Sequence, residues 1–308
     1  MFGNTLIIVN PVARSGKASE AAAYLTSHLP LITQAEKKNH SLHFKYTVAP
    51  KDGTKIAYEF GSKVDTIIAL GGDGHIHEIV NGLMLLPKDK RPQLAVLPCG
   101  NGDDFGRALQ LNRTPEKALY QLVNSKCIYT DIGKVNGEYF DETLSFGLDA
   151  AIALETMDRR KTTNNTGTIL YIQAGLNQLK NHRDEYQCTI TLDNKDPFTT
   201  SLYLIAVQNG PYYGGGFKIC PNAKTNDGLF DICYATPTLS FSTALRLFGS
   251  ALNGGHVGHK NISFNVAESL VLDFEKPIPA QIDGEPISGT HFEITMEKEA
   301  LRILYPSK

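Results

Sequence analysis

The chain has 308 residues, enough for two domains of ordinary size, and 42% of them are hydrophobic, so each domain can bury a core. Its 30 basic residues nearly balance its 32 acidic ones and are scattered, which argues against a nucleic-acid partner. The N-terminus lacks a basic segment followed by an apolar one, and no run approaches the ~18 apolar residues of a membrane span. We therefore expect a cytoplasmic protein of two domains.

The first part of the chain alternates short apolar runs with segments of helical spacing. Strands are predicted at residues 6–9, 44–48, 66–69 and 94–97, and helices at 18–29, 54–61, 78–86 and 115–123. A repeated strand-turn-helix pattern is typical of a parallel sheet with helices on both faces. In such α/β domains the ligand crevice lies at the carboxyl ends of the strands.

Loops of small residues follow three of these strands. The most informative is Gly71-Gly72-Asp73-Gly74, where glycines let backbone amides approach an anion at the start of a helix. A phosphate would repel Asp73 unless a metal ion, an incoming hydroxyl or a ribose lay between them, so Asp73 favours phosphoryl chemistry over passive anion binding. Taken as an isolated string, Gly-Gly-Asp-Gly is explained equally well by an ordinary tight turn. The loop at Ser15-Gly16 lacks the G-x-x-x-x-G-K-[ST] pattern, which disfavours a Walker-type ATPase.

Beyond Cys127 the pattern changes to strands, several of them with alternating polarity. They are predicted at residues 127–135, 139–146, 186–192, 200–207, 229–234, 270–274 and 292–295, with helices at 168–181 and 239–252 and a mobile loop at 158–167. We therefore expect a nucleotide-binding α/β domain at residues 1–127 and a mostly antiparallel, sandwich-like domain at 128–308, whose tail is a candidate to return to the first domain.

The cysteines are odd in number, widely spaced and without a C-x-x-C pair. This pattern favours buried free thiols over disulfides or a metal site. His256 and His259 lie in a glycine-rich segment without an obvious partner, and we favour surface or loop-packing roles for them over metal binding.

With its elements placed, nearly the whole chain resembles the diacylglycerol kinase catalytic-domain family of lipid kinases, which includes bacterial soluble diacylglycerol kinases and the sphingosine and ceramide kinases. The motifs are Asn10-Pro11 with Ser15-Gly16, Gly71-Gly72-Asp73-Gly74 with His77-Glu78-Ile79-Val80-Asn81-Gly82, Pro98-x-Gly100 with Asp104-Phe105, Asp131-Ile132-Gly133, Gly214-Gly215-Gly216, Asn226-Asp227-Gly228 and Asp283-Gly284-Glu285. The resemblance implies a fold similar to that of NAD kinase and phosphofructokinase, with the active site in an interdomain cleft.

The resemblance also implies an activity, in which Mg²⁺ and ATP are used to phosphorylate a hydroxyl of a membrane lipid, diacylglycerol or a related lipid alcohol. The nucleotide contacts that it implies are Asn10, Arg14, Ser15, Gly16, Thr47, Gly72, Asp73, Gly74, His75, Glu78 and Asn101. Asp104 and Asp131, with Asp73, match acids that hold a catalytic Mg²⁺ largely through water. A lipid substrate implies peripheral association with the membrane, and the bacterial relatives suggest a homodimer.

A second metal site is implied at residues 224–229, where Lys224 and Leu229 would supply carbonyl oxygens and Asp227 a carboxylate to a structural Mg²⁺. A plain Asn-Asp-Gly hairpin turn explains the same residues, and the two interpretations are compatible.

Asp283 and Glu285 match the family's catalytic acids. We expect Glu285 to accept the proton of the lipid hydroxyl and Asp283 to support it or the metal, with Asp73 as the alternative base.

Some residues depart from the family pattern. His75 replaces a threonine, His77 and Asp103 replace asparagines, and Asn101 replaces a threonine. These changes either tune nucleotide or metal preference or are tolerated variation. Two other functions therefore stay open: NAD-kinase-like phosphorylation of a soluble substrate, and a catalytically inactive nucleotide-binding sensor.

Overall fold

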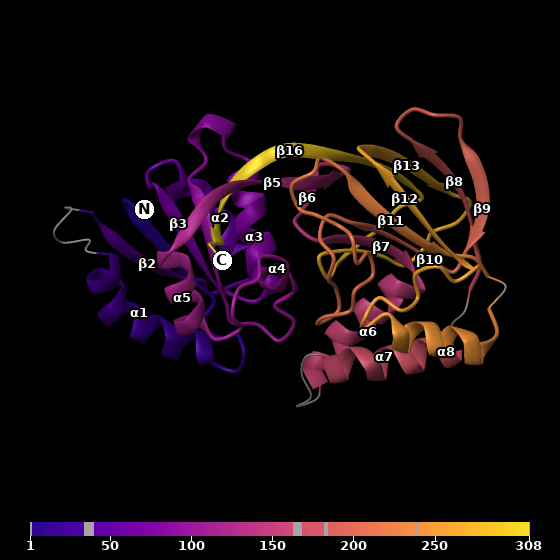
Figure 1. The fold of residues 1–308 in the computed structure, drawn as a ribbon, viewed down its shortest axis with the longest axis horizontal. Coiled ribbons are helices and arrows are strands. Elements are labelled where there is room, and N and C mark those ends of the chain that lie inside the picture. The colour runs from indigo at the N-terminus through magenta and orange to yellow at the C-terminus, as the bar shows by residue number, and fades with distance from the viewer. Residues whose placement is uncertain (1, 34–39, 163–167, 182–183, 238, 308) are drawn as a thin grey trace. The chain divides into compact units, whose positions relative to one another are not determined.

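The computed structural model describes residues 2–33, 40–162, 168–181, 184–237 and 239–307, whose chain course is drawn in Figure 1. The chain divides into two compact units, one formed by Met1–Thr130 with Glu299–Lys308 and the other by Asp131–Lys298. Within the described ranges, no helix combines the length and the apolar character that crossing a membrane would require.

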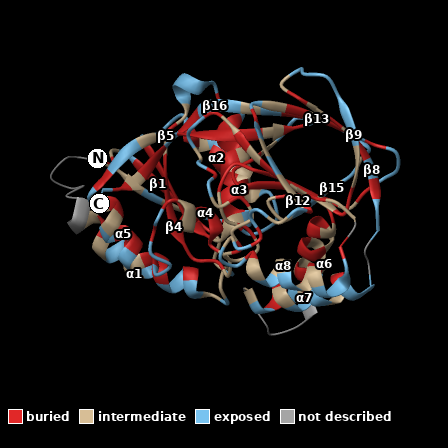
Figure 2. Ribbon diagram, turned by 45° about the vertical axis from the view of Figure 1, so that its right-hand side comes forward, coloured by how far each residue is buried: buried red, intermediate tan, exposed pale blue. Residues whose placement is uncertain are grey.

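The first unit is built on a parallel sheet, as predicted. Its strands are β1 (Thr5–Val9), β2 (Leu42–Tyr46), β3 (Thr66–Gly71) and β4 (Gln93–Pro98), in the spatial order β2-β1-β3-β4. The last strand of the chain, β16 (His291–Pro306), pairs in parallel with β4 through Ile303 and Leu94. Every residue of β1 and β3 is buried, as expected for strands covered on both faces, and Figure 2 colours buried residues red.

The helices of this unit are α1 (Lys17–Thr33), α2 (Asp52–Gly61), α3 (Asp73–Met84), α4 (Asp104–Ala108) and α5 (Pro115–Val123), with a short 3₁₀ turn, η2, at Lys88–Lys90. Helix α2 packs on α3, and α1 contacts α5. Gly82 makes the first contact close, because a Cβ there would overlap the Thr54 carbonyl oxygen. Helix α3 starts at Asp73, earlier than the predicted start at residue 78, so the glycine loop itself forms the beginning of the helix.

The second unit contains two antiparallel sheets, as expected from its alternating pattern. One sheet has the order β16-β13-β8-β9 and the other β12-β11-β10-β7-β14-β15. The bounds of the strands, with those of the hairpin β5-β6, are β5 (Ser125–Val135), β6 (Glu138–Phe140), β7 (Thr143–Gly147), β8 (Tyr186–Leu192), β9 (Phe198–Leu202), β10 (Leu204–Gln208), β11 (Phe230–Ala235), β12 (Ile262–Ala267), β13 (Ser269–Phe274), β14 (Ala280–Ile282) and β15 (Glu285–Ile287).

A shared core joins side chains of both sheets. The ring of Phe146 on β7 lies 5.4 Å from that of Phe274 on β13 and 4.7 Å from that of Phe292 on β16, measured between centroids. Two predicted strands are wrong in extent: residues 139–146 divide into β6 and β7, and 200–207 into β9 and β10. The break between β6 and β7 falls at Asp141 and Glu142, two buried acids whose backbone amides bind Asp283 in place of a ladder partner.

Three helices complete this unit: α6 (Leu148–Thr162), α7 (Thr168–Asn181) and α8 (Phe241–Ser250). The mobile loop predicted at 158–167 is wrong for residues 158–162, which continue α6, while 163–167 lie outside the described residues. Glu155 explains why a polar segment stays helical: its carboxylate accepts from Arg159 one turn on (2.5 Å) and from Asn177 (2.9 Å) and Gln178 (2.7 Å) of α7.

The cysteines are free thiols, as predicted. Cys99, Cys188, Cys220 and Cys233 are buried, but the prediction of a buried thiol is wrong for Cys127, which lies near the start of β5 where Lys126 and Tyr129 are exposed as well.

Candidate active site

The predicted nucleotide loops of the first unit lie at one edge of its sheet. Asn10 follows β1, Thr47 follows β2, Gly72 follows β3 and Asn101 lies beyond the end of β4. The backbone ladder continues into these loops, since the Thr47 amide donates to Val9 (2.9 Å) and the Asn10 amide to Leu70 (3.0 Å). The carboxyl ends of these parallel strands therefore present the loops together, where an α/β domain binds its ligand.

The loop after β1 has an unusual backbone. Arg14, Ser15 and Gly16 have consecutive positive φ angles of 49°, 56° and 91°, and no atom lies within 4 Å of the position that a Cβ on Gly16 would take. The Gly16 amide donates to the Ala13 carbonyl (3.2 Å), so this amide is bonded within the turn. The space beside Gly16 is open, and the phosphate contacts of Arg14, Ser15 and Gly16 stay predictions.

The loops after β3 and β4 touch through glycines. A Cβ on Gly72 would lie 2.8 Å from the Cα of Gly100, closer than real Cβ contacts come. Glycine at these two positions therefore lets the two loops approach each other. This close approach brings the acids of both loops together.

Asp73 occupies the first turn of α3, and one of its carboxylate oxygens accepts the amide of Phe105 at the start of α4 (3.3 Å). Burial of its carboxyl, reinforced by the negative charges of Asp104 and Asp103, raises the pKa of Asp73 to about 8. A bound cation would oppose that shift, because it stabilises the carboxylate. This group of acids fits the divalent cation that the resemblance implies for Asp73 and Asp104.

Asp103, which departs from the family pattern, has a partner that sequence reasoning missed. Its buried carboxylate accepts the Gly100 amide (2.6 Å) and lies 3.3 Å from Nε of Arg113. The guanidinium of Arg113 also donates to the carbonyl of Asn101 (2.9 Å), and the carbonyl of Arg113 accepts from Arg14 (3.2 Å). The extra acid is therefore charge-paired and ties the β4 loop to a neighbouring segment; no sequence motif marks Arg113.

His75 and Glu78 use their side chains within the unit. Buried His75 bonds through Nε2 to the Ile8 carbonyl (3.0 Å), and burial lowers its pKa. Glu78 accepts the amides of Lys51 (2.7 Å) and Gly53 (2.9 Å) at the start of α2. Both side chains thus have structural partners, and their nucleotide contacts stay predictions.

In the second unit, Asp131 is bound to the loop predicted to hold a structural metal. Its carboxylate accepts the Gly228 amide (2.7 Å), and its own amide donates to the Thr225 carbonyl (2.7 Å). Asp227 accepts the amide of Leu229 (3.3 Å), and Gly228 has a φ of 77°. The turn interpretation of this loop therefore agrees with the structure. Asp104, the other predicted ligand of the catalytic metal, lies in the first unit.

The residues of this loop fit a hard cation. Burial, and after it the charge of Asp227, raises the pKa of Asp231 to about 6, while Lys224 opposes the shift. The negative charges of Asp227 and Asp231 influence each other, and carboxylate oxygens are ligands that suit Mg²⁺. Lys224, Asp227 and Leu229 stay the predicted ligands.

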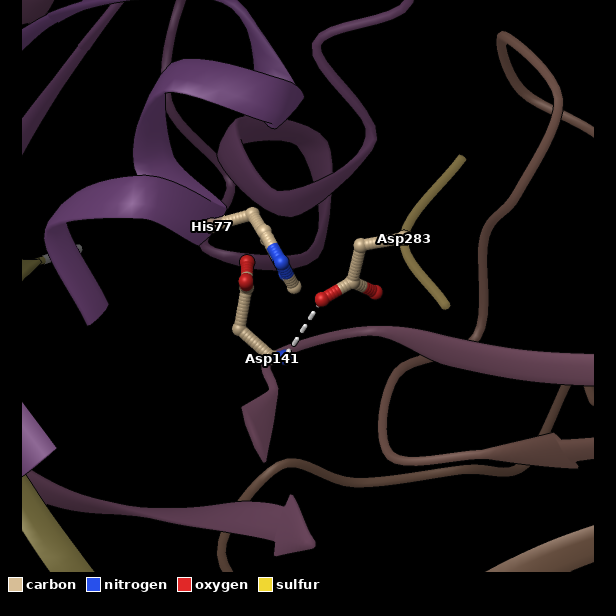
Figure 3. A group of neighbouring side chains, drawn as sticks. All are labelled: His77, Asp141 and Asp283. Atoms are coloured by element: carbon tan, nitrogen blue, oxygen red, sulfur yellow. Dashed lines mark hydrogen bonds between the residues drawn. The ribbon is translucent and has the colours of Figure 1, made fainter. Parts of the chain in front are cut away.

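Asp283 and Glu285 lie at a tight turn between β14 and β15, where Asp283 and Gly284 have φ angles of 45° and 95°. The Asp283 carboxylate accepts the amides of Asp141 (2.9 Å, Figure 3), Glu142 (3.2 Å) and Thr143 (2.8 Å). Asp283 is therefore an anchor for the turn, whereas the side chain of Glu285 is exposed. This difference favours Glu285 over Asp283 as the group that takes part in chemistry.

Asn209 is a further residue that sequence reasoning missed. Its side-chain amide donates to the carbonyls of Asp131 (2.8 Å) and Asp141 (2.9 Å), and its backbone amide donates to Glu142 (2.8 Å). It thus connects the Asp131 segment with the segment that anchors Asp283. An asparagine at the end of an apolar strand carries no local signal of this role.

An α/β unit with glycine loops at one sheet edge and acids among them, followed by an antiparallel sandwich unit with an acidic turn, defines the class of two-domain kinases that includes the lipid kinases. Comparison with known proteins agrees. The family model of the diacylglycerol kinase catalytic domain matches residues 4–135, and that of the YegS C-terminal NAD kinase beta sandwich-like domain matches 142–305.

Individual relatives give the same result. Proteins named "Probable lipid kinase YegS-like" from Yersinia pestis (strain Pestoides F) and Yersinia pseudotuberculosis serotype O:1b (strain IP 31758) are 34% identical over 272 residues, covering 86% of this chain and 88% of theirs. A crystal structure of a candidate diacylglycerol kinase from Bacillus anthracis str. Sterne superposes with a TM-score of 0.80 and 28% identity, covering 99% of this chain and 95% of that one. The chain belongs to the YegS-like lipid kinases of the diacylglycerol kinase catalytic-domain family.

Proposed function

We propose that this kinase transfers the γ-phosphate of ATP, with Mg²⁺, to a hydroxyl group of a membrane lipid, diacylglycerol or a related lipid alcohol. The observation that carries the proposal is the position of Asp73. It stands in the first turn of a helix, beside glycine loops at the carboxyl ends of the strands and next to the acids of a second loop. Phosphoryl transfer needs this combination of donors for phosphate oxygens and carboxylates for a metal.

The backbone supplies the phosphate contacts in this proposal. The space beside Gly16 and beside Gly74 in the first turn of α3 is open, and the N-terminus of α3 offers backbone amides that suit the phosphates of ATP. Mg²⁺ bound near Asp73 and Asp104 would neutralise charge on the phosphates.

Glu285 is the general base in the proposal. It is exposed at the end of a turn that Asp283 holds through three backbone amides, so its backbone is held in place while its carboxylate is free to reach a hydroxyl. General-base assistance contributes roughly 10²- to 10⁴-fold to a rate. The lipid acceptor is proposed from the family and from the names of the relatives.

The test is Mg²⁺-dependent transfer of labelled γ-phosphate from ATP to lipid alcohols in mixed micelles. The panel contains diacylglycerol, phosphatidylglycerol, a polyprenol and a sphingoid base, with NAD as a soluble acceptor. We expect labelled lipid with the native chain, a loss of roughly 10²- to 10⁴-fold in Glu285→Gln, and a loss in Asp73→Asn. The exposed acid Glu275 provides the control, and Glu275→Gln should retain full activity. Labelling of NAD alone would replace the proposal with a soluble-substrate kinase, and ATP binding without any labelled acceptor would replace it with a sensor.

A further inference from the structure

The second unit buries polar side chains where one of its sheets meets a helix. Helix α6 packs on β7, β10 and β14, and Asp149 at its start interacts with Ser145 of β7. Ser145 stands opposite Gln281 of β14 in the ladder, and both have an exposed fraction of 0%. Their strand neighbours Leu144 and Ile282 belong to the apolar core. A glutamine buried beside a helix loses its bonds to water, so its hydrogen bonds within the protein must offset that cost.

The side chain of Gln281 is bonded at both ends. Its Oε1 accepts the backbone amide of Gly284 (2.6 Å), and its Nε2 donates to Oγ of Ser145 (2.7 Å). A backbone amide can only donate, so the atom that faces Gly284 must be the oxygen, and the orientation of the Gln281 amide is fixed. Gln281 thus connects the turn before Glu285 to the buried polar side chains under α6.

The Gly284 amide lies in the two-residue turn between β14 and β15. Ile282 and Glu285 pair across this turn, and Asp283 and Gly284 both have positive φ angles, as in a type I′ turn. Types I′ and II′ differ in the orientation of the peptide plane between the two central residues, and that plane carries the Gly284 amide. Because a buried side chain bonds this amide, the plane directly before Glu285 is held in one orientation.

Gln281 provides a second attachment for the turn, separate from that of Asp283. The carboxylate of Asp283 accepts the amides of residues 141–143, and its own amide donates to the Thr143 carbonyl (2.9 Å). Gln281 bonds the next peptide from within β14 itself. Two attachments restrict rotation about each of them, which a single attachment does not.

We propose that Gln281 is a positioning residue of this kinase: by holding the Gly284 amide, it fixes the backbone from which the carboxylate of Glu285 reaches the acceptor hydroxyl. Ser145 supports it by bonding the other end of its amide. The inference rests on the proposed function, in which Glu285 is the general base. It adds to that function a residue that contacts neither substrate nor metal.

The experiment compares Gln281→Met, which keeps the length of the side chain without its amide, with Gln281→Glu, which keeps an oxygen for the Gly284 amide. We expect Gln281→Met to lower kcat about 10- to 100-fold at nearly unchanged KM for ATP, because a small displacement of a reacting group costs that much. Gln281→Glu should recover most of the activity. The matched control is Gln208→Met, since Gln208 is an equally buried glutamine whose amide bonds Thr143 and not the turn, and it should keep its kcat.

Two further measurements separate positioning from a general loss of structure. In a Glu285→Gln background, Gln281→Met should cause little additional loss, because a residue that acts through Glu285 then has nothing to position. Exchange of the Gly284 amide hydrogen with solvent, followed by NMR without nucleotide or lipid, should become about fivefold faster or more in Gln281→Met. Circular dichroism establishes that each variant is folded, and Ser145→Ala, a milder change to the same network, should lower kcat less than Gln281→Met.

Equal fold-losses from Gln281→Met in the native and Glu285→Gln backgrounds would overturn the inference, and so would unchanged exchange of the Gly284 amide. A native chain that labels no acceptor would remove the proposed function, and the inference with it. The exchange measurement distinguishes these two failures, because it needs no substrate and reports only whether Gln281 holds the turn.

Discussion

Contacts of individual side chains explain how this kinase accommodates residues that depart from the family pattern. Asp103 replaces a neutral residue of the family pattern and is buried, yet Arg113 and the Gly100 amide compensate its charge. A buried carboxylate without such partners would be strongly destabilising. The local partners of Asp103 therefore accommodate this departure from the motif within the fold.

We predict that Arg113→Ala destabilises the first unit by about 1–3 kcal/mol, because the buried carboxylate of Asp103 then lacks its cation. The loss is limited to this range because Arg113 is half-exposed and solvent screens the pair. ATP affinity should fall as well, since Arg113 also holds the Asn101 carbonyl. Urea unfolding and ATP-analogue titration measure the two effects. The double variant Arg113→Ala/Asp103→Asn should recover most of the stability; if it does not, charge pairing is not what the arginine provides.

A second residue-scale prediction concerns Asp149, which is buried at the start of α6 and accepts the Tyr171 hydroxyl (3.0 Å). Burial raises the pKa of Asp149 to about 6, above the value of about 3.8 expected in the unfolded chain. The folded state therefore holds this proton more tightly, so the contribution is favourable below about pH 4 and is lost as the pH rises to about 6. The loss amounts to about 3 kcal/mol.

Asp149→Asn should remove this pH dependence, because an amide keeps an acceptor for Tyr171 and never ionises. The variant is then more stable than the native chain at pH 7.5, and the gain shrinks at pH 4.5. Urea unfolding at both pH values measures it. A gain of equal size at both pH values would contradict the titration of Asp149 as its cause.

At the scale of elements, the contact between α2 and α3 determines where the glycine loop points. The carboxylate of Glu78 on α3 accepts hydrogen bonds from the first backbone amides of α2. Gly82 lets the Thr54 carbonyl of α2 lie against the α3 backbone. An acid at a helix N-terminus satisfies amides that have no partner inside the helix. The family motif around Glu78-Ile79-Val80-Asn81-Gly82 therefore has a packing function beside any contact with ATP.

We predict that Glu78→Ala lowers the free energy of unfolding by about 1–3 kcal/mol, because the carboxylate's hydrogen bonds from the backbone amides of Lys51 and Gly53 are lost. Glu59→Ala, which removes an exposed acid of α2, should stay within about 0.5 kcal/mol of the native chain. Denaturant titration compares the two variants. A stable Glu78→Ala variant with lost ATP binding would instead assign this side chain to the nucleotide.

The Gly82→Ala variant should cost about 1–3 kcal/mol or more, because its Cβ overlaps a backbone carbonyl that cannot rotate away. The matched substitution is Gly74→Ala in the same helix, where a Cβ meets no atom within 4 Å. Thermal unfolding of the two variants isolates the close contact from the general effect of replacing glycine in a helix. Equal changes in both variants would show that the α2–α3 approach is not limiting.

At the scale of the whole molecule, a divalent cation should couple its binding to folding through the loop at residues 224–229. Asp131 connects this loop to β5, so a cation at Asp227 would stabilise the fold around it. We predict that Mg²⁺ at about one hundred times its dissociation constant raises the free energy of unfolding by about 2.7 kcal/mol. Asp227→Asn should abolish most of this stabilisation, while Asp196→Asn, at an exposed position of the same unit, should keep it. Differential scanning calorimetry with and without Mg²⁺ measures the effect. If Mg²⁺ raised the unfolding temperature of Asp227→Asn as much as that of the native chain, the cation would bind elsewhere.

The local sequence by itself determined the architecture of both units. Buried apolar runs of four or five residues, each followed by a turn and a helical pattern, indicate parallel strands, and alternating runs indicate the antiparallel sheets, because both signals depend on residues near one another in the chain. The same local order carried the motifs by which the family resemblance, and with it the loops around Asp73, could be predicted.

Only the tertiary structure decided what individual side chains in those motifs do. The carboxylate of Asp283 accepts hydrogen bonds from backbone amides about 140 residues earlier in the chain. Arg113 pairs with Asp103 across a loop. The polar C-terminal part of α6 stays helical because Glu155 accepts hydrogen bonds from side chains of α7. Such partners are distant in sequence, so no periodicity or spacing records them. A hydrogen bond depends on where two groups lie in the folded chain. The candidate site could therefore be located from the sequence, but the structural partner of each of its acids could not.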